Sequence, residues 1–303
     1  MKVVISGSLG HISKPLAKEL ITKGHSVTII SSKAEKQREI ENIGAKAAIG
    51  TIEDVAFLAV AFSGADIVYT MVPPVNFFDP TLDIIAYYVQ LANNFKHAIL
   101  QAGITKVIHL STIAAHTNKG NGMLAYGYEI ESVLKTLPVN VAIKFMRPVG
   151  FYYNMFAFIP AIKNAGSIFQ NYGGNKLKEP WVSPLDIAET IDEEIELPFD
   201  GRKIRYIASD EVTPNEAASI LGNAIGKPDL KWVVISNEDF IANLVRAGFS
   251  QQAAEGLAGM NAGRVSGVLY EDYHIHKPIL GKVKLTDFAK EFAAVYNQGS
   301  YQH

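Results

Sequence analysis

A short glycine-containing segment near the start of the chain has the residue types and spacing needed to hold a phosphate group. Gly7 and Gly10 follow the apolar run at 2–6, and the small residue Ser13 comes three positions later, giving GSLGHIS. Glycine lets the backbone turn tightly and lets a diphosphate approach main-chain N–H groups, while a helix that starts here adds unpaired N–H donors and a partial positive charge. The segment therefore predicts a dinucleotide-binding turn, with a purely structural turn as the alternative. The residues expected to contact the nucleotide here are Gly7, Ser8, Leu9, Gly10, His11 and Ile12.

The end of the second expected strand indicates which dinucleotide would bind. An acidic residue at this position would bind the ribose 2′-hydroxyl and repel a 2′-phosphate, but the chain has Ser31, Ser32 and Lys33, with Lys36 one turn on and no acid before Glu35. A hydrogen bond to a charged group contributes about 1.5–3 kcal/mol, so one lysine can shift the preference roughly tenfold to a hundredfold. We expect Ser32, Lys33 and Lys36 to favour NADP, with NAD possible; the alternative is a solvated helix start.

The elements around this turn alternate between strand and helix through the first half of the chain. Strands are expected at 2–6, 26–31, 46–49, 66–72, 106–111 and 140–146, with helices at 12–23, 33–43, 81–102 and 123–137 and one more capped by Thr51. Strands that are apolar on both faces and separated by helices indicate a parallel sheet covered on both sides. Right-handed crossovers then favour a doubly wound sheet, so the predicted fold class is α/β, a Rossmann-type doubly wound parallel sheet with a smaller C-terminal α+β lobe.

Beyond Gly150 the regular alternation stops, and aromatic and small residues mix in a way that predicts irregular backbone over a pocket. Further on, Ser183 and Thr213 each precede a proline and carry an acid three positions later, which is typical of a capped helix start. Short strands are expected at 205–208 and 231–235 and helices at 216–226, 238–248 and 287–296. We therefore expect an NAD(P)-binding domain at 1–150, to which 181–208 returns, and a substrate-binding lobe at 151–303.

A series of segments in order along nearly the whole chain resembles the NmrA-like branch of the atypical short-chain dehydrogenases, relatives of isoflavone-reductase-like and quinone-reductase-like proteins. These segments are GSLGHIS, GTIED, TMVPP, KVIHLST, the run from EIESVLK to IKFMRPVGFYYNM, EPWVSPLDIAE, DEVTPNEAASIL and ILGKVKLTDFAKEF. The resemblance implies a Rossmann domain with a smaller C-terminal substrate lobe. It also implies contacts from Thr51 and Ile52 to the adenine end of the cofactor, and contacts near the nicotinamide ribose from Val72, Pro73 and Pro74.

The usual catalytic pair of short-chain dehydrogenases is missing from the matching helix. That pair is a tyrosine with a lysine four residues later, whose ammonium lowers the tyrosine pKa. Here Tyr126 and Tyr128 are followed at that spacing by Ile130 and Ser132. Reductases that the chain resembles often carry a lysine or histidine four residues before a glutamate that matches Glu131, and this chain has Gly127 there. Quinones and activated alkenes accept hydride readily and take their proton from water, so a reductase remains possible. Its candidate catalytic residues are Tyr126, Tyr128 and Ser111.

Two more groups lie at the expected carboxyl edge of the sheet, where ligands bind in folds of this kind. Ser111, Pro148 and Gly150 end or follow the fifth and sixth strands and are expected to approach the cofactor. The aromatic run that follows, with Phe151, Tyr152 and Asn154, is expected to wall a flat apolar substrate. The alternative for the two aromatic residues is the core of the smaller lobe. Asn154 is expected to need a hydrogen-bond partner, since the run around it is apolar.

Composition narrows the classes of function further. The 303 residues include no cysteine, 28 Lys+Arg and 30 Asp+Glu, so thiolate chemistry is excluded and no basic surplus favours nucleic acid. His274 and His276 would share a strand face, but no third ligand accompanies them, so no metal site is expected. Without a signal peptide or a long apolar span, we expect a cytoplasmic protein away from membranes, as a monomer or homodimer.

Two functions follow from these observations. The first is NADPH-dependent reduction of a small apolar quinone, carbonyl or activated alkene. The second is a catalytically silent NADP(H)-sensing protein that acts through a partner protein, the one case in which nucleic acid would also be relevant.

Overall fold

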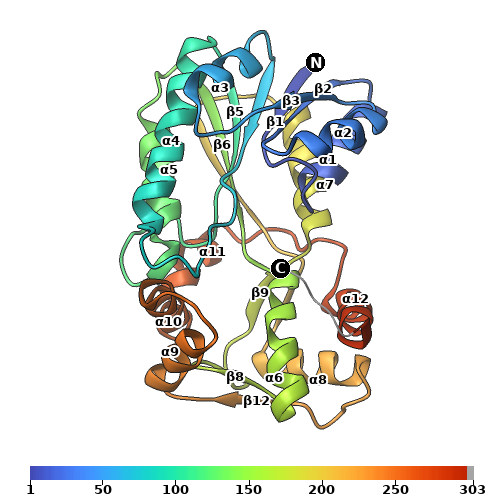
Figure 1. Ribbon diagram of the computed structural model, residues 1–303, viewed down its shortest axis with the longest axis vertical. Helices are drawn as coiled ribbons and strands as arrows, with labels where there is room; N and C mark the ends of the chain where they lie inside the picture. Colours follow the sequence, from blue (N-terminus) through green and yellow to red (C-terminus); the bar gives the residue numbers. More distant parts are fainter. Residues whose placement is uncertain (299–303) are drawn as a thin grey trace.

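A computed structural model describes residues 1–298 of the chain, and its larger part is an open sheet of seven strands (Figure 1). Every neighbouring pair in this sheet is parallel. The order across the sheet is β3-β2-β1-β4-β5-β6-β10, so the direction in which the chain adds strands reverses between β1 and β4. This confirms the doubly wound parallel sheet. The strands are β1 (Lys2–Ile5), β2 (Ser26–Ser31), β3 (Lys46–Ile49), β4 (Ile67–Thr70), β5 (Lys106–Leu110), β6 (Ala142–Pro148) and β10 (Arg202–Ile207).

Helices cover both faces of the sheet because successive strand residues face opposite ways and both sets are apolar. Val3 and Ile5 belong to one core and Val4 to the other. Figure 1 shows α1, α2 and α7 on one side of the sheet and α3, α4 and α5 on the other. The helices are α1 (Ser13–Thr22), α2 (Gln37–Asn42), α3 (Val55–Phe62), α4 (Ile84–Gln101), α5 (Ala125–Lys135) and α7 (Pro184–Glu196), with short 3₁₀ helices η1 (Ala34–Lys36) and η2 (Gly122–Leu124).

Two of the three N-cap residues predicted from the sequence are confirmed. Ser183 accepts a hydrogen bond from the Leu185 N–H at the start of α7, as predicted. Thr213 and Glu216 form a reciprocal capping box, also as predicted. The prediction that Thr51 caps α3 is wrong. Asp54 is the N-cap instead and accepts from two N–H groups, because its charged oxygen is the stronger acceptor at the positive end of a helix.

The smaller lobe is built from two short sheets and a group of helices, shown at the lower end of Figure 1. One sheet has the order β11-β9-β7, and the other pairs β12 with β8. These strands are β7 (Gly150–Phe151), β8 (Ser167–Gln170), β9 (Glu179–Val182), β11 (Asp210–Val212) and β12 (Lys231–Val234). The remaining helices are η3 (Tyr152–Phe158), α6 (Ile159–Ala165), α8 (Pro214–Ala224), α9 (Asn237–Arg246), α10 (Gln251–Ser266), η4 (Val268–Tyr270), α11 (Glu271–Ile275) and α12 (Leu285–Gln298). Of these, η4 and α11 pack against the larger part, because Leu269, Tyr270 and Tyr273 belong to its core.

The chain passes between the two lobes more than once. It leaves the large sheet after β6, returns for α7 and β10, and leaves again for β11 and the helices that follow. His274 lies on α11 and His276 directly after it, so the prediction that these histidines share a strand face is wrong. None of the helices in the described part of the chain is long and apolar enough to cross a membrane.

Candidate functional site

The glycine segment forms a tight turn at the carboxyl end of β1, beside the point where the strand order reverses. Gly7 has φ +97°, and a Cβ placed there would lie 2.4 Å from Met71 Sδ and 2.9 Å from Ser13 Oγ. Ser8 also has a positive φ, +54°, and its Oγ donates to Ser31 Oγ at 2.9 Å. Gly10 has an ordinary backbone angle, and its nearest neighbour would be the Gly7 carbonyl at 3.2 Å. Gly7 is therefore the residue that the turn requires to be glycine.

The start of α1 fits an anionic ligand. Its N-cap, Ile12, offers no side-chain hydrogen bond, and its first turn contains no acidic residue. Ser13 faces inward, where its Oγ donates to the Ser6 carbonyl at 3.1 Å. The N–H groups at the helix start therefore lack a side-chain acceptor and keep their partial positive charge, which is the arrangement that binds phosphate groups. Gly7 is itself exposed, so a ligand can reach the turn.

The adenosine end of the predicted site lies at the carboxyl ends of β2 and β3. Ser32 and Lys33 are exposed, and the Lys33 N–H donates to Ser31 Oγ at 3.2 Å. Lys36 lies nearby, with its ammonium 2.8 Å from a Glu39 carboxylate oxygen. After β3, Thr51 is exposed and Ile52 is half-buried. These residues thus line one edge of the sheet, although Lys36 is paired with an acid that the sequence argument did not consider.

The nicotinamide end of the predicted site lies beyond β4, where Val72 and Pro73 are half-buried and Pro74 is exposed. The Tyr88 hydroxyl donates to the Pro73 carbonyl at 3.0 Å, and the Tyr88 ring contacts the Tyr126 ring with centroids 4.7 Å apart. Burial raises the pKa of the Tyr126 phenol, and a hydrogen bond with Thr112 offsets only part of that rise. Tyr126 is therefore a neutral hydrogen-bonding group beside the end of β5.

Ser111 directly follows β5, and its hydroxyl proton is already donated in a hydrogen bond to a side chain. Its Oγ donates to Glu131 Oε1 at 2.6 Å, and Glu131 is fully buried. Arg147 donates to both oxygens of Glu131, at 2.9 and 2.7 Å. Burial alone would raise the pKa of Glu131, but the hydrogen bonds and charge of Arg147 outweigh it and hold that pKa below its usual range. Ser111 is therefore held by a carboxylate and faces any ligand as an acceptor.

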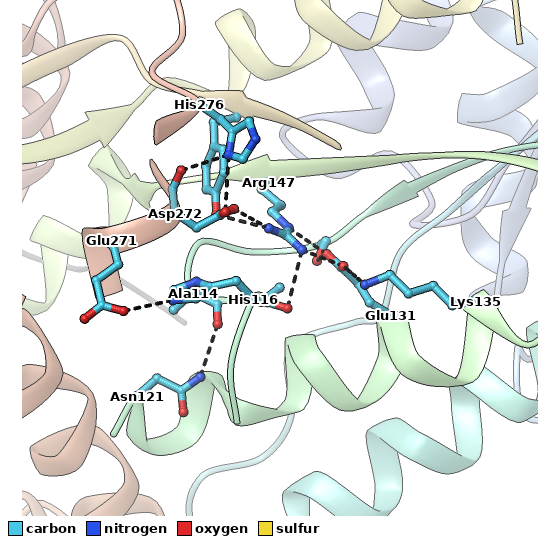
Figure 2. Close-up of polar contacts among 12 residues, drawn as sticks. Ala114, His116, Asn121, Glu131, Lys135, Arg147, Glu271, Asp272 and His276 are labelled. Atoms are coloured by element: carbon cyan, nitrogen blue, oxygen red, sulfur yellow. Dashed lines mark hydrogen bonds and ion pairs between the residues drawn. The ribbon is translucent and has the colours of Figure 1, made fainter. Parts of the chain in front are cut away.

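The charges around Glu131 extend to the C-terminal segment. Arg147 also donates to Asp272 Oδ2 on α11 at 2.7 Å, and the Tyr206 hydroxyl donates to the same oxygen at 2.7 Å. Figure 2 shows Arg147 between the two carboxylates. This cluster was not predicted from the sequence. A usable signal was Arg147 itself, since an arginine at the end of a buried strand requires acidic partners.

Gly127 occupies the position on α5 where the resemblance implies a lysine or histidine, and neighbouring atoms leave no room for a side chain there. A Cβ on Gly127 would lie 2.5 Å from Thr112 Cγ2, so helix α5 packs directly on the loop that follows β5. Tyr128 is half-buried one residue further along. Because each helical residue turns about 100° from the last, Tyr126 and Tyr128 point in widely different directions. Of these two candidates, Tyr126 is the one placed between the ends of β4 and β5.

The aromatic run after β6 forms a 3₁₀ helix, η3, in which every third residue faces the same way. Tyr152, Met155 and Phe158 face the core of the smaller lobe, where the Tyr152 hydroxyl donates to the Val283 carbonyl at 3.1 Å. Asn154 is exposed, so water can serve as the hydrogen-bond partner that this residue was expected to need.

Tyr153, which the sequence argument left out, is the member of the run that reaches the glycine turn. Its ring contacts His11, with centroids 5.1 Å apart, and Phe151 at 5.2 Å. Pro148 ends β6, and Gly150 packs close to the Trp181 ring, which a Cβ would approach to 3.2 Å. The sequence gives no signal that separates Tyr153 from the buried aromatic residues around it, since Phe156, three residues later, lies in the core of the smaller lobe.

Comparison with solved structures shows the same fold in several proteins. The NADPH-dependent quinone oxidoreductase QOR2 of Escherichia coli, solved with NADPH, is 19% identical with a TM-score of 0.79, covering 95% of this chain and 99% of its own. The triphenylmethane reductase of a Citrobacter species, solved with NADP(H), is 18% identical with a TM-score of 0.75, covering 96% and 99%. A nucleoside-diphosphate-sugar epimerase of Staphylococcus aureus is 18% identical with a TM-score of 0.75, covering 96% and 100%.

Sequence comparison gives the family. No curated protein matches the chain in sequence. The sequence model of the NmrA-like family, however, matches residues 1–270, which is most of the chain and includes the glycine turn, Glu131 with Arg147, and the aromatic run. The chain therefore belongs to the NmrA-like family.

Proposed function

We propose that the chain is an NADPH-dependent reductase of a small apolar quinone, carbonyl or activated alkene. The observation that carries this proposal is the turn at Gly7, which has no room for a Cβ between Met71 and Ser13 and which leads into the start of α1, a helix start with no side-chain cap. The turn lies beside the point where the strand order reverses, which is where doubly wound sheets bind their ligands. The names of two structural neighbours, a quinone oxidoreductase and a dye reductase, agree with this choice.

Three regions along the edge of the sheet would each bind a different portion of NADPH. The diphosphate is assigned to the turn, the adenosine to the ends of β2 and β3, and the nicotinamide to the region between Pro73 and Ser111. We assign the nucleotide to 1–150 together with 181–208, and the substrate to the remaining lobe. The proposed cofactor contacts are Gly7, Ser8, Leu9, Gly10, His11, Ile12, Ser32, Lys33, Lys36, Thr51, Ile52, Val72, Pro73, Pro74, Ser111, Pro148 and Gly150.

The side chains near the end of β5 suggest how the acceptor is handled. When bound, NADPH supplies a hydride; a quinone that takes it together with one proton from water leaves as a hydroquinone, with NADP⁺ as the other product. Ser111 accepts a hydrogen bond from the cofactor, since its own proton is donated to Glu131. Tyr126 donates to the acceptor oxygen as a neutral phenol. Phe151 and Tyr153 wall the acceptor on the side of the smaller lobe.

One observation favours the second candidate function, a sensor of NADP(H) without turnover. Position 127 has no side chain and is closed by Thr112, and Ser111 has no proton to give. Acceptors that must be protonated by an acidic side chain would therefore not be reduced. Quinones and activated alkenes, which can take their proton from water, are then the acceptors that decide between the two functions. Absence of turnover with a panel of these acceptors, together with tight binding of both NADP⁺ and NADPH, would favour the sensor.

The binding proposal is tested by replacing Gly7 with valine and titrating NADPH by calorimetry. We expect the affinity to fall roughly a hundredfold, because valine strains the left-handed turn and clashes with Met71 and Ser13, which displaces the backbone N–H groups that would hold the diphosphate. Gly24→Val is the matched control, since Gly24 has φ +84° and no neighbour within 4 Å of its Cβ position. A folded Gly7→Val variant that binds NADPH as tightly as Gly24→Val would refute the proposed site.

A further inference from the structure

Two lysines meet one carboxylate at the corner where the glycine turn, the end of β2 and helix α2 come together. Lys14 Nζ lies 2.9 Å from Glu39 Oε1, and Lys36 Nζ lies 2.8 Å from Glu39 Oε2. Lys14 is in the first turn of α1, four residues after Gly10, and Lys36 is five residues after the last residue of β2. The hydrogen bond from Ser8 to Ser31 joins these two segments at 2.9 Å. The three charged groups are each about 40% exposed, so a ligand from solvent can reach them.

The charges of this corner leave a net positive site. Lys14 and Lys36 contribute two positive charges and Glu39 one negative charge. The two ammonium groups hold the pKa of Glu39 at about 2, so its carboxylate stays ionised at neutral pH. Lys33 adds a further positive charge, while Glu35 and Arg38, on the same segment, offset each other. A doubly charged phosphate that approaches this corner therefore meets two cations that are already held by an acid.

We propose that Glu39 holds Lys14 and Lys36 at the 2′-phosphate position of the adenosine ribose and limits how strongly the chain prefers NADPH over NADH. This inference rests on the proposed nucleotide site, because the ribose of a dinucleotide lies at the end of the second strand of the sheet. The 2′-phosphate takes the place of Glu39 as the partner of the two ammonium groups. NADH lacks that phosphate and leaves the Lys14–Glu39–Lys36 triad undisturbed.

The sign of each substitution follows from Coulomb's law. Glu39→Gln removes a negative charge next to the phosphate, so NADPH binds more tightly while NADH is nearly unaffected. A unit charge a few ångströms from a phosphate, in a largely aqueous setting, changes the affinity roughly fivefold to tenfold at low salt. Lys14→Met and Lys36→Met each change the ratio of the NADH and NADPH dissociation constants by a similar factor in the opposite direction. All three effects shrink when the ionic strength is raised, because the groups are exposed.

The experiment measures the Kd of NADPH and of NADH by calorimetry for the full chain and for the variants. The ratio of the two constants is the readout, since it cancels any general loss of nucleotide binding. Glu41→Gln is the matched control: it removes the same charge from α2, but Glu41 accepts from Gln37 and contacts neither lysine. We expect Glu39→Gln to raise the preference for NADPH roughly fivefold or more and Glu41→Gln to change it less than about twofold.

The outcomes separate this inference from the nucleotide site on which it rests. A preference that rises equally in Glu39→Gln and Glu41→Gln would reflect net charge alone and overturn the role of Glu39. A preference that falls in Glu39→Gln would show that the acid supports phosphate binding, which also overturns it. A ratio unchanged in Lys14→Met excludes that lysine from the phosphate position. If the unmodified chain binds neither nucleotide, the proposed function itself fails.

Discussion

Replacing Gly127 with alanine tests whether Thr112 closes this position on α5 to any side chain. Alanine in a helix interior is about 1 kcal/mol more favourable than glycine. In this chain its Cβ would lie 2.5 Å from Thr112 Cγ2, and overpacking of this kind costs about 1–3 kcal/mol. We therefore expect Gly127→Ala to lower the free energy of unfolding by about 0–2 kcal/mol, although the same change at an open helical site would raise it.

A second substitution, Thr112→Ser, shows whether the loss of stability in Gly127→Ala comes from the contact with Thr112 Cγ2. Serine keeps the hydroxyl that faces Tyr126 but removes the Cγ2 methyl, which leaves Ala115 Cβ at 3.3 Å as the nearest neighbour of the new Cβ. In the serine background we expect Gly127→Ala to raise the free energy of unfolding by about 0.5–1 kcal/mol. The coupling between the two substitutions is then about 1–3 kcal/mol.

Urea unfolding of the two single variants and the double variant, followed by tryptophan fluorescence and circular dichroism, measures that coupling. Ser132→Ala on the same helix is the control, and its effect should be the same in both backgrounds because it lies away from Thr112. If the effects of Gly127→Ala and Thr112→Ser add to within about 0.5 kcal/mol, the contact is absent and position 127 is open. A side chain at position 127 would then be sterically possible.

Two further predictions concern ionisable groups near the same sheet edge. Burial lowers the pKa of His109 to about 4, against an unfolded value near 6.5, so the unfolded chain binds this proton first as the pH falls. Stability should therefore decline between about pH 6.5 and pH 4, and His109→Gln, measured by urea unfolding across this range, should flatten the slope; an unchanged slope contradicts the assignment. Tyr126→Phe keeps the packing on Tyr88 but removes the phenolic hydrogen bond, so kcat with a quinone acceptor should fall about tenfold to a hundredfold at unchanged Kd for NADPH. A kcat equal to that of the unmodified chain would exclude Tyr126 from the proposed reaction.

Much of the fold could be predicted from the sequence because its signals are local. Strands apolar on both faces are visible in the spacing of residues, and so are the capped helix starts at Ser183 and Thr213. Helix α10 escaped prediction because its contact face is made of glycines rather than a periodic apolar stripe. A Cβ on Gly122 would lie 2.1 Å from the Met260 nitrogen, so backbone packs on backbone there.

Residues of the candidate site could be predicted only where they lie close together in the sequence. The glycine turn is such a segment, and the structure shows which of its two glycines is required. The cluster at Glu131 was missed because its members come from α5, β6, β10 and α11, and their approach depends on the finished fold. The triad at Glu39 was missed for the same reason, since Lys14 and Lys36 lie on separate helices and meet only through the acid.

Helix α7 and strand β10 belong to the larger part of the molecule although they follow strands of the smaller lobe in the sequence, and this affects how the chain can be truncated. A fragment that stops at residue 150 would lack the strand that borders β6 and the helix that packs on α1, so it would present an unpaired sheet edge and a bare apolar face to water. Edges of this kind promote association between chains. An exchange of the smaller lobe between relatives must therefore join the chains at three places, near residue 150 and on either side of 184–207, and keep that middle stretch with the large sheet.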